Sequence, residues 1–130
     1  MTLCKDVVTN ADELVALYAA GERNFRAARL LEADLSNVAL LKINLNASNL
    51  TLANLSHANF SGANLSQVML IMADLSGADL SGANLSRANL SGANLSGANL
   101  SGANLSGAVL TKAIITDSTL LEPQSREIKG

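Results

Sequence analysis

Side chains able to take part in catalysis are few in this chain and lie far apart in its sequence. His57 is the only histidine, and it falls among serines that recur every five residues. Because those serines repeat so regularly, none stands out as a partner for His57 in a Ser-His-acid set. The spacing predicts that the serines serve the repeat as small polar residues, and that His57 is a solvated surface residue.

The acidic residues and the cysteine also offer no reactive group. Asp34, Asp74 and Asp79 replace Asn at equivalent places in the repeat, and they are too dispersed for a calcium site or a catalytic carboxylate pair. Cys4 is the only cysteine, which excludes an internal disulfide and a multi-cysteine metal site. The Gly-Ser units lack the lysine of a phosphate-binding loop. We therefore expect that the chain is not an enzyme and binds no metal and no cofactor.

The composition is that of one folded domain with an unusual core. Apolar residues make up 48% of the 130 residues and the net charge is −2, which does not fit a disordered chain. Aromatic residues make up only 2%, so the core must consist of Leu and Ala. The N-terminal stretch lacks the apolar region of a signal peptide, and no apolar run is long enough to span a membrane. We expect a cytoplasmic protein.

A period of five residues runs through most of the chain. Leu, Phe or Ile occupies every fifth position from Phe25 to Leu120, and the residue two positions before is usually small and most often Ala. On an α-helix, five residues advance about 500°, so the leucines would scatter around the cylinder. On a strand, successive leucines would alternate between the two faces. Neither regular element buries them all, and a flexible Gly/Ser linker would not place Leu so regularly.

A chain that turns a corner every five residues keeps every leucine inside. Four such corners close a coil of twenty residues, and stacked coils can hydrogen-bond to one another like parallel strands. The period therefore predicts an all-β solenoid of about five 20-residue coils. Glycines such as Gly82 and Gly92 fall at the expected corners, where a positive φ can be required.

The unit Ala-(Asp or Asn)-Leu-x-x resembles the repeat of the pentapeptide-repeat family over about three quarters of the chain. The resemblance implies a right-handed quadrilateral parallel β-helix, and it is closest to small cytoplasmic members that are common in cyanobacteria. Ser48 and Ser118 depart from the pattern because they are polar at the inward small position. Arg23 at the same position predicts that the regular coils start just after it.

The two ends of the chain differ from the repeat. Residues 1–23 are expected to form an N-terminal segment with a short capping helix over about residues 10–21, because Asn10 and Glu13 resemble a capping box and Gly21 suits a helix stop. This helix either covers the first coil or binds a partner. The β-helix is expected over residues 24–121. Residues 122–130, which include the only proline, are expected to be a flexible tail.

The resemblance leaves two functions open. Some family members mimic DNA and inhibit or protect type II topoisomerases such as gyrase, which requires an acidic surface. Between Arg23 and Leu120, six basic and five acidic residues leave a net charge of +1. We therefore favour a rigid protein-interaction module, with the DNA-mimicking gyrase inhibitor or protector as the alternative. The basic residues form no stripe, and no aromatic side chains accompany them as a nucleic-acid surface would require. No nucleic acid is therefore expected as a partner.

One face of the predicted coils carries apolar side chains at outward positions. The segment VMLIM, residues 68–72, replaces three polar positions at once. Folding the sequence into 20-residue coils stacks Leu52 on Met72 and Thr51 on Ile71. The candidate protein-interaction patch, called the apolar patch below, consists of Leu31, Leu52, Met69, Ile71 and Met72. It either binds an unknown protein partner or reflects side chains that simply stack along the face. We expect a monomer, with weak self-association as the other outcome.

Overall fold

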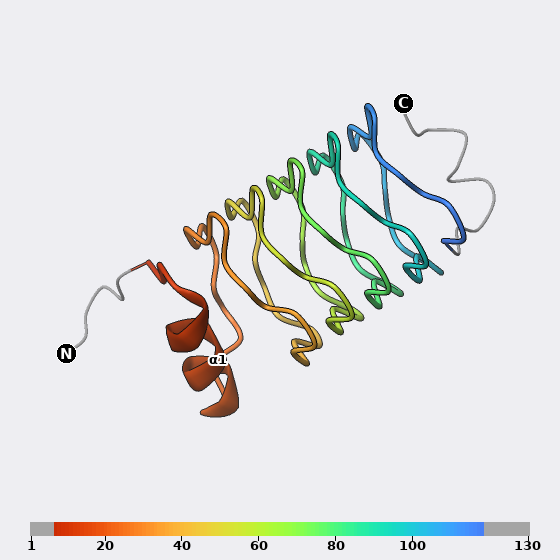
Figure 1. Ribbon diagram of the computed structural model, residues 1–130. Helices are drawn as coiled ribbons and strands as arrows, with labels where there is room; N and C mark the ends of the chain where they lie inside the picture. Colours follow the sequence, from red (N-terminus) through yellow and green to blue (C-terminus); the bar gives the residue numbers. More distant parts are fainter. Residues whose placement is uncertain (1–6, 119–130) are drawn as a thin grey trace.

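The structure is a computed structural model that describes residues 7–118. Cys4 and the tail expected at residues 122–130 lie outside the described residues. One helix, α1 (Ala11–Ala19), is followed by a stack of coils, and the helix lies at one end of that stack (Figure 1). The expected solenoid is therefore confirmed, with a helix beside its first coil.

Parallel β-bridges join residues that are 20 apart along the whole stack. They run from Asn24↔Asn44 to Asn94↔Ile114, and each bridge is a single residue in each strand. Within any 20 residues, four bridges alternate with four turns, as at positions 24, 29, 34 and 39. The coil is thus four-sided with the predicted register, and its first bridge follows directly after Arg23, as the sequence indicates.

One repeat unit, residues 84–88, shows why the period is five. Two backbone N–H groups join the unit to the next coil: Leu85 donates to the Asn104 carbonyl at 2.7 Å, and Arg87 to the Ser106 carbonyl at 2.8 Å. The Asn84 N–H donates to the previous coil, at Ala63, 2.9 Å away. The remaining two stay within the unit: Ala88 N–H reaches the Leu85 carbonyl at 3.0 Å and Ser86 N–H reaches Asn84 Oδ1 at 3.0 Å. All five N–H donors of the unit are satisfied, which a coiled backbone requires.

The Asn or Asp of the unit therefore has a structural role. Its Oδ1 accepts the N–H of the residue two later, which is an Asx turn that satisfies a donor no other coil reaches. Asp34 and Asp79 do this as Asn54 does, with N···Oδ1 distances of 3.0 Å in each case. Asp replaces Asn in the repeat because both side chains supply the same acceptor.

Every turn places its third residue at positive φ. The described residues hold twelve non-glycine residues in this conformation, such as Ala47 at 63° and Met72 at 60°, beside glycines such as Gly82 at 67°. The expectation that glycines mark the corners is confirmed, but the corner conformation does not depend on glycine. The turn bond from the fourth residue's N–H to the first residue's carbonyl, with positive φ at the third residue, is the pattern of a type II turn.

The interior is a column of leucines and alanines. Each central Leu or Phe from Phe25 to Leu110 is buried, and so are most of the small residues two positions earlier. Ile115, the next in the series, is exposed. The five-residue pattern therefore identifies the core correctly as far as the last fully stacked coil.

Helix α1 ends and begins with hydrogen bonds that the sequence indicates. Asn10 Oδ1 accepts the Glu13 N–H at 2.8 Å, which caps the N-terminus. Gly21, at φ 105°, follows the last turn, and the Gly21 and Glu22 N–H groups donate to Tyr18 and Leu17. These two bonds form a Schellman stop. Leu14 is fully buried, so the helix packs its apolar face on the first coil.

A short segment before the helix joins the solenoid in register, which the sequence analysis missed. The Arg29 N–H donates to the Val8 carbonyl at 2.9 Å. This is the same 21-residue step that joins Asn49 to Ala28 one coil later. Val8 is buried and occupies the inward small position 20 residues before Ala28. One side of the first coil is therefore covered by a partial coil, and α1 takes the place of the rest.

Candidate functional site

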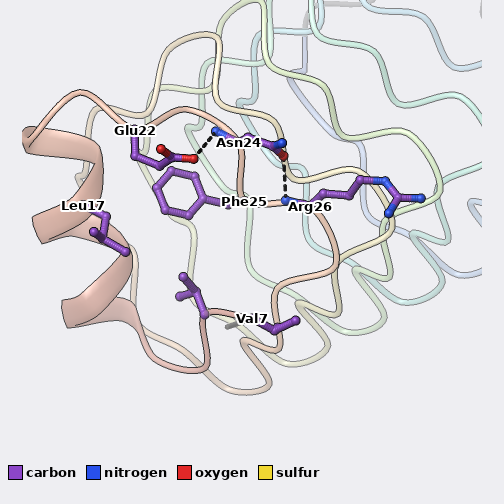
Figure 2. A pocket seen from close by; sticks show the side chains of 7 residues that line it. Val7, Leu17, Glu22, Asn24, Phe25 and Arg26 are labelled. Carbon is purple, nitrogen blue, oxygen red and sulfur yellow. Dashed lines mark hydrogen bonds between the residues drawn. The ribbon is translucent and has the colours of Figure 1, made fainter. Parts of the chain in front are cut away.

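A pocket of about 300 Å³ lies between α1 and the first coil, lined by Val7, Val8, Leu17, Glu22, Asn24, Phe25 and Arg26. The side chains of Glu22 and Asn24 accept backbone N–H groups of the residues two positions later, as Figure 2 shows. Glu22 Oε2 accepts the Asn24 N–H at 3.2 Å, and Asn24 Oδ1 accepts the Arg26 N–H at 3.3 Å. The Arg26 Nε donates to Asn46 at 3.0 Å. The hollow thus lies at the seam between the helix and the solenoid.

Tyr18 and Arg23 hold that seam closed. The Arg23 guanidinium lies 3.7 Å from the centroid of the Tyr18 ring and donates through Nη1 to the Tyr18 carbonyl at 2.9 Å. The Tyr18 hydroxyl donates to the Leu41 carbonyl at 2.9 Å. The arginine that interrupts the repeat pattern thus joins the helix to the first coil, and it serves a packing role at this end.

The side chains that the sequence analysis considered for catalysis or metal binding either lie exposed on the surface or form the hydrogen bonds of the repeat. Ser36 donates through its N–H and its hydroxyl to Asp34 Oδ1, at 3.0 and 2.7 Å. The hydroxyl bond first and the backbone bond second lower the pKa of Asp34 below its usual value. His57 is exposed and its ring lies over Gly77, 2.5 Å from where a Cβ on that glycine would stand. Among the residues that the structure describes, no three metal-ligating side chains come together.

The apolar patch lies along one corner of the solenoid and the side next to it. Backbone bonds fix the stacking: the Leu52 N–H donates to the Ile71 carbonyl at 2.9 Å, and the Met72 N–H donates to Ser91 at 2.8 Å. Met69 pairs with Asn49 and Asn89 on the adjoining side. Leu52 and Met72 are therefore successive members of one column, as the sequence predicts.

The patch side chains are open to solvent. The exposed fractions are 57% for Leu31, 49% for Leu52, 41% for Met69 and 59% for Met72, while Ile71 is half-buried. The Met72 sulfur lies 2.6 Å from the point where a Cβ on Gly92 would stand, so this side chain also covers the next coil. The result is a group of apolar side chains on three neighbouring coils, of a kind that adapts well to a partner.

Shallow hollows border the N-terminal end of the patch on both sides of Leu31. One, of about 430 Å³, is lined by Thr9, Arg29, Leu31 and Asn49. The other, of about 400 Å³, is lined by Thr9, Asn10, Ala11, Asp12, Leu31, Ala33 and Asp34. Sequence reasoning missed both, because they depend on where residues 9–12 cross the first coil. Leu31 therefore stands as a ridge between two depressions.

Comparison with known proteins gives a family and related structures. The family model of pentapeptide repeats, in eight copies, matches four overlapping segments that together span residues 28–120. A crystal structure of a pentapeptide repeat protein (Rfr23) from the cyanobacterium Cyanothece 51142 is 28% identical with a TM-score of 0.70, over 92% of this chain and 95% of that one. A pentapeptide repeat protein from the thylakoid lumen of Arabidopsis thaliana is 32% identical with a TM-score of 0.53, over 72% and 68%. A search of curated proteins found no match. Within residues 7–118, no helix has the length and apolar content to cross a membrane.

Proposed function

The chain belongs to the pentapeptide-repeat family, and on that premise we propose that it is a non-enzymatic scaffold whose apolar patch binds a protein partner. The repeat region, which the sequence assigns to residues 24–121, would act as a rigid support. Its backbone donors and acceptors are used between coils, so the coil leaves side chains as the means of recognition. The partner would meet the patch on one corner and one side of the solenoid.

The observation that carries this proposal is that five apolar departures gather on one corner and the side next to it, whereas the exposed Leu41 and Ile114 lie elsewhere. The equivalent outward positions elsewhere hold mostly Ser, Asn and Gly, as in residues 91–102. Five apolar residues at repeat positions that are usually polar lie together on the corner and side described above, and four of them are exposed. Burying such side chains against a partner removes apolar area from water, which favours the complex by roughly 25 cal/mol for each Å² buried.

No observation favours the DNA-mimicking alternative. Such mimicry requires an acidic stripe that resembles a phosphate ladder. The acidic residues of the solenoid are interrupted within their own columns, since Asn54 lies between Asp34 and Asp74. Basic residues such as Arg87 and Lys112 stand among them at other corners. A protein partner with a complementary apolar surface is therefore a better match to this solenoid than the DNA-binding site of a topoisomerase.

The experiment is capture of a partner from a lysate of the source organism by the tagged chain and by a patch variant. The variant Leu52→Asp with Met72→Asp removes two exposed apolar side chains that stack on successive coils. Both positions have φ near 60°, a conformation that Asp tolerates better than Leu or Met. We expect the variant to fold and to lose the partner.

A matched control is available on another corner. Ala47 and Gln67 are exposed, stack on successive coils, and have φ of 63° and 59°. The variant Ala47→Asp with Gln67→Asp adds the same two negative charges at the same kind of position. A partner that is lost by the patch variant and retained by this control supports the proposal. A partner that both variants retain contradicts it.

A further inference from the structure

The column of turn residues at the centre of the apolar patch is complementary to itself. The column, called the residue-72 column here, contains Glu32, Leu52, Met72, Gly92 and Lys112 in that order along the solenoid. Met72 is in the middle, an acid ends the column on one side and a base ends it on the other. Reversing the column about Met72 places Glu32 where Lys112 was, and Leu52 where Gly92 was.

Backbone hydrogen bonds keep this column straight. The N–H groups of Glu32, Leu52, Met72 and Gly92 each donate to a carbonyl of the next coil, at 2.8–2.9 Å. Coils stacked like strands are about 4.8 Å apart. Glu32 and Lys112 therefore lie on opposite sides of Met72 at equal distances, each about 10 Å away along the solenoid. Both end residues are exposed.

We propose that the apolar patch binds a second copy of this chain, arranged antiparallel about a two-fold axis that passes beside Met72. In that arrangement Glu32 of each copy meets Lys112 of the other, so that two ion pairs close the ends of the contact. Leu52 of each copy lies over Gly92 of the other, a residue already covered by the Met72 side chain. Two leucines and two methionines then form the apolar centre. An interface of this kind is isologous, as most homodimer interfaces are.

The neighbouring columns of the patch are compatible with the same axis. Leu31, Thr51, Ile71, Ser91 and Thr111 form the next column, and its reversal brings Ile71 against Ile71 and Thr51 against Ser91. On the adjoining side, Met69 meets Met69 and Asn49 meets Asn89. Arg29 falls opposite Val109 and adds no ion pair. The contact is thus apolar at its centre, and each end combines an ion pair with Leu31 and Val109, which face polar residues of the other copy.

The other turn columns lack this symmetry. The column of Ala27, Ala47, Gln67, Arg87 and Gly107 brings Arg87 opposite alanine when reversed. The column of Asn37, His57, Gly77, Gly97 and Asp117 brings the acid opposite an amide. The column that begins at Lys42 continues with Gly62, Gly82 and Gly102. Only the residue-72 column combines an apolar centre with opposite charges at equal distances, which is why the second copy is the occupant that we infer.

The size of the strip sets the strength of association. Five coils span about 20 Å between the first and last residue of the column. A strip of this length, limited to one corner and one adjoining side, buries well below the roughly 800 Å² per partner of a standard stable interface. We therefore expect a weak dimer that forms at protein concentrations of roughly 0.1–1 mM.

A charge-swap series tests the arrangement by sedimentation equilibrium at low salt, where screening of the two ion pairs is small. Glu32→Lys alone places two lysines opposite each other at both ends, and Lys112→Glu alone does the same with two acids. Each single variant should weaken dimerisation by about tenfold. The double variant Glu32→Lys with Lys112→Glu restores both pairs and should return to within about threefold of the wild type.

The control is Lys42→Glu, which reverses a charge at an exposed turn residue with φ of 60° on another corner. It should leave dimerisation unchanged. Circular dichroism melts establish that each variant folds. A wild-type chain that stays monomeric at about 1 mM overturns the proposal, and so does a double variant that is no better than the single variants.

This inference rests on the proposed function only in that both use the apolar patch, and the two fail separately. A monomeric wild type, together with a heterologous partner that Leu52→Asp with Met72→Asp loses, overturns the second copy and leaves the scaffold function. A charge-dependent dimer, together with a heterologous partner that the patch variant retains, overturns that function and leaves the dimer.

Discussion

In the turns between residues 25 and 74, nine of the ten residues at positive φ carry a side chain, and Gly62 is the exception. In the turns between residues 75 and 110, six of the seven are glycine, and Arg87 is the exception. The φ angles of both sets lie between 59° and 72°. The two regions therefore have the same turn backbone, built from different sequences.

The difference shows what imposes the turn. A left-handed conformation costs a non-glycine residue roughly 1–2 kcal/mol, yet Ala47 and Leu52 adopt it as readily as Gly97. The buried leucines and the bonds between coils are the same in both regions, so they must force the conformation. Glycine lowers the cost of the corner but does not create it. The turns of the first region can therefore present side chains at the surface, where the glycines of the second region present none.

The largest effect is expected from removing a buried leucine, and it should be equal in the two regions. Leu45 and Leu85 occupy the same interior column two coils apart, and both are fully buried. Leu45→Ala and Leu85→Ala should each lose roughly 2–5 kcal/mol through lost transfer energy and the cavity left behind. Urea unfolding midpoints measure both. A loss of stability in one region more than twice that in the other would show that the coils of the two regions differ in more than their surface.

A pair of opposite exchanges at the turns should give effects of opposite sign. Gly97 has φ of 68°, and a Cβ there would meet only the Gly77 backbone nitrogen at 4.0 Å. Gly97→Ala should therefore lose roughly 1–2 kcal/mol from backbone strain alone. Ala47→Gly relieves the same strain at φ 63°, partly offset by the greater freedom of glycine in the unfolded chain, and should gain up to about 1 kcal/mol. Thermal melts measure both variants. Melting temperatures that shift in the same direction for the two would refute this explanation of the glycines.

A smaller loss is expected at Ser48, the buried hydroxyl in the first region. The Ser48 Oγ accepts the Ala28 N–H at 2.9 Å and donates to the Phe25 carbonyl at 3.3 Å. An inward hydroxyl without a partner would make Ser48→Ala neutral or stabilising, but this hydroxyl has two backbone partners. Because the turn bond from Ala28 to Phe25 remains at 3.2 Å, the loss should be only about 0.5–1.5 kcal/mol. A urea midpoint equal to or above that of the wild type would show that the two bonds add nothing.

Much of the fold could be predicted because one physical constraint, the burial of a leucine every five residues, excludes both helix and strand. The 20-residue register then follows, and it correctly stacks Leu52 on Met72. The partners of Ser48 and the joining of Val8 to Arg29 could not be predicted in this way. The Val8–Arg29 bond depends on the contact between the first coil and the segment before it, where the period is absent, and the Ser48 bonds depend on a hydroxyl that the repeat normally lacks at that position.

The candidate site was less accessible to sequence reasoning than the fold. Outward apolar residues can be listed by column, but exposure depends on neighbours, so Ile71 is half-buried while Met72 is open. Leu41, which is also exposed, lies on a different corner and was not predicted. The position of Met72 over Gly92 depends on a side-chain rotamer that no repeat pattern specifies.

The most direct test of the account is the urea unfolding midpoint of the variant Leu52→Gly with Met72→Gly, which gives two successive turns of the first region the glycine that is usual in the second. If the patch side chains serve recognition and not the scaffold, the relief of strain at φ 63° and 60° should balance the lost contacts. The stability should then stay within about 1 kcal/mol of the wild type or rise. A loss of more than about 2 kcal/mol would contradict the account, because it would show that these side chains hold the coils together.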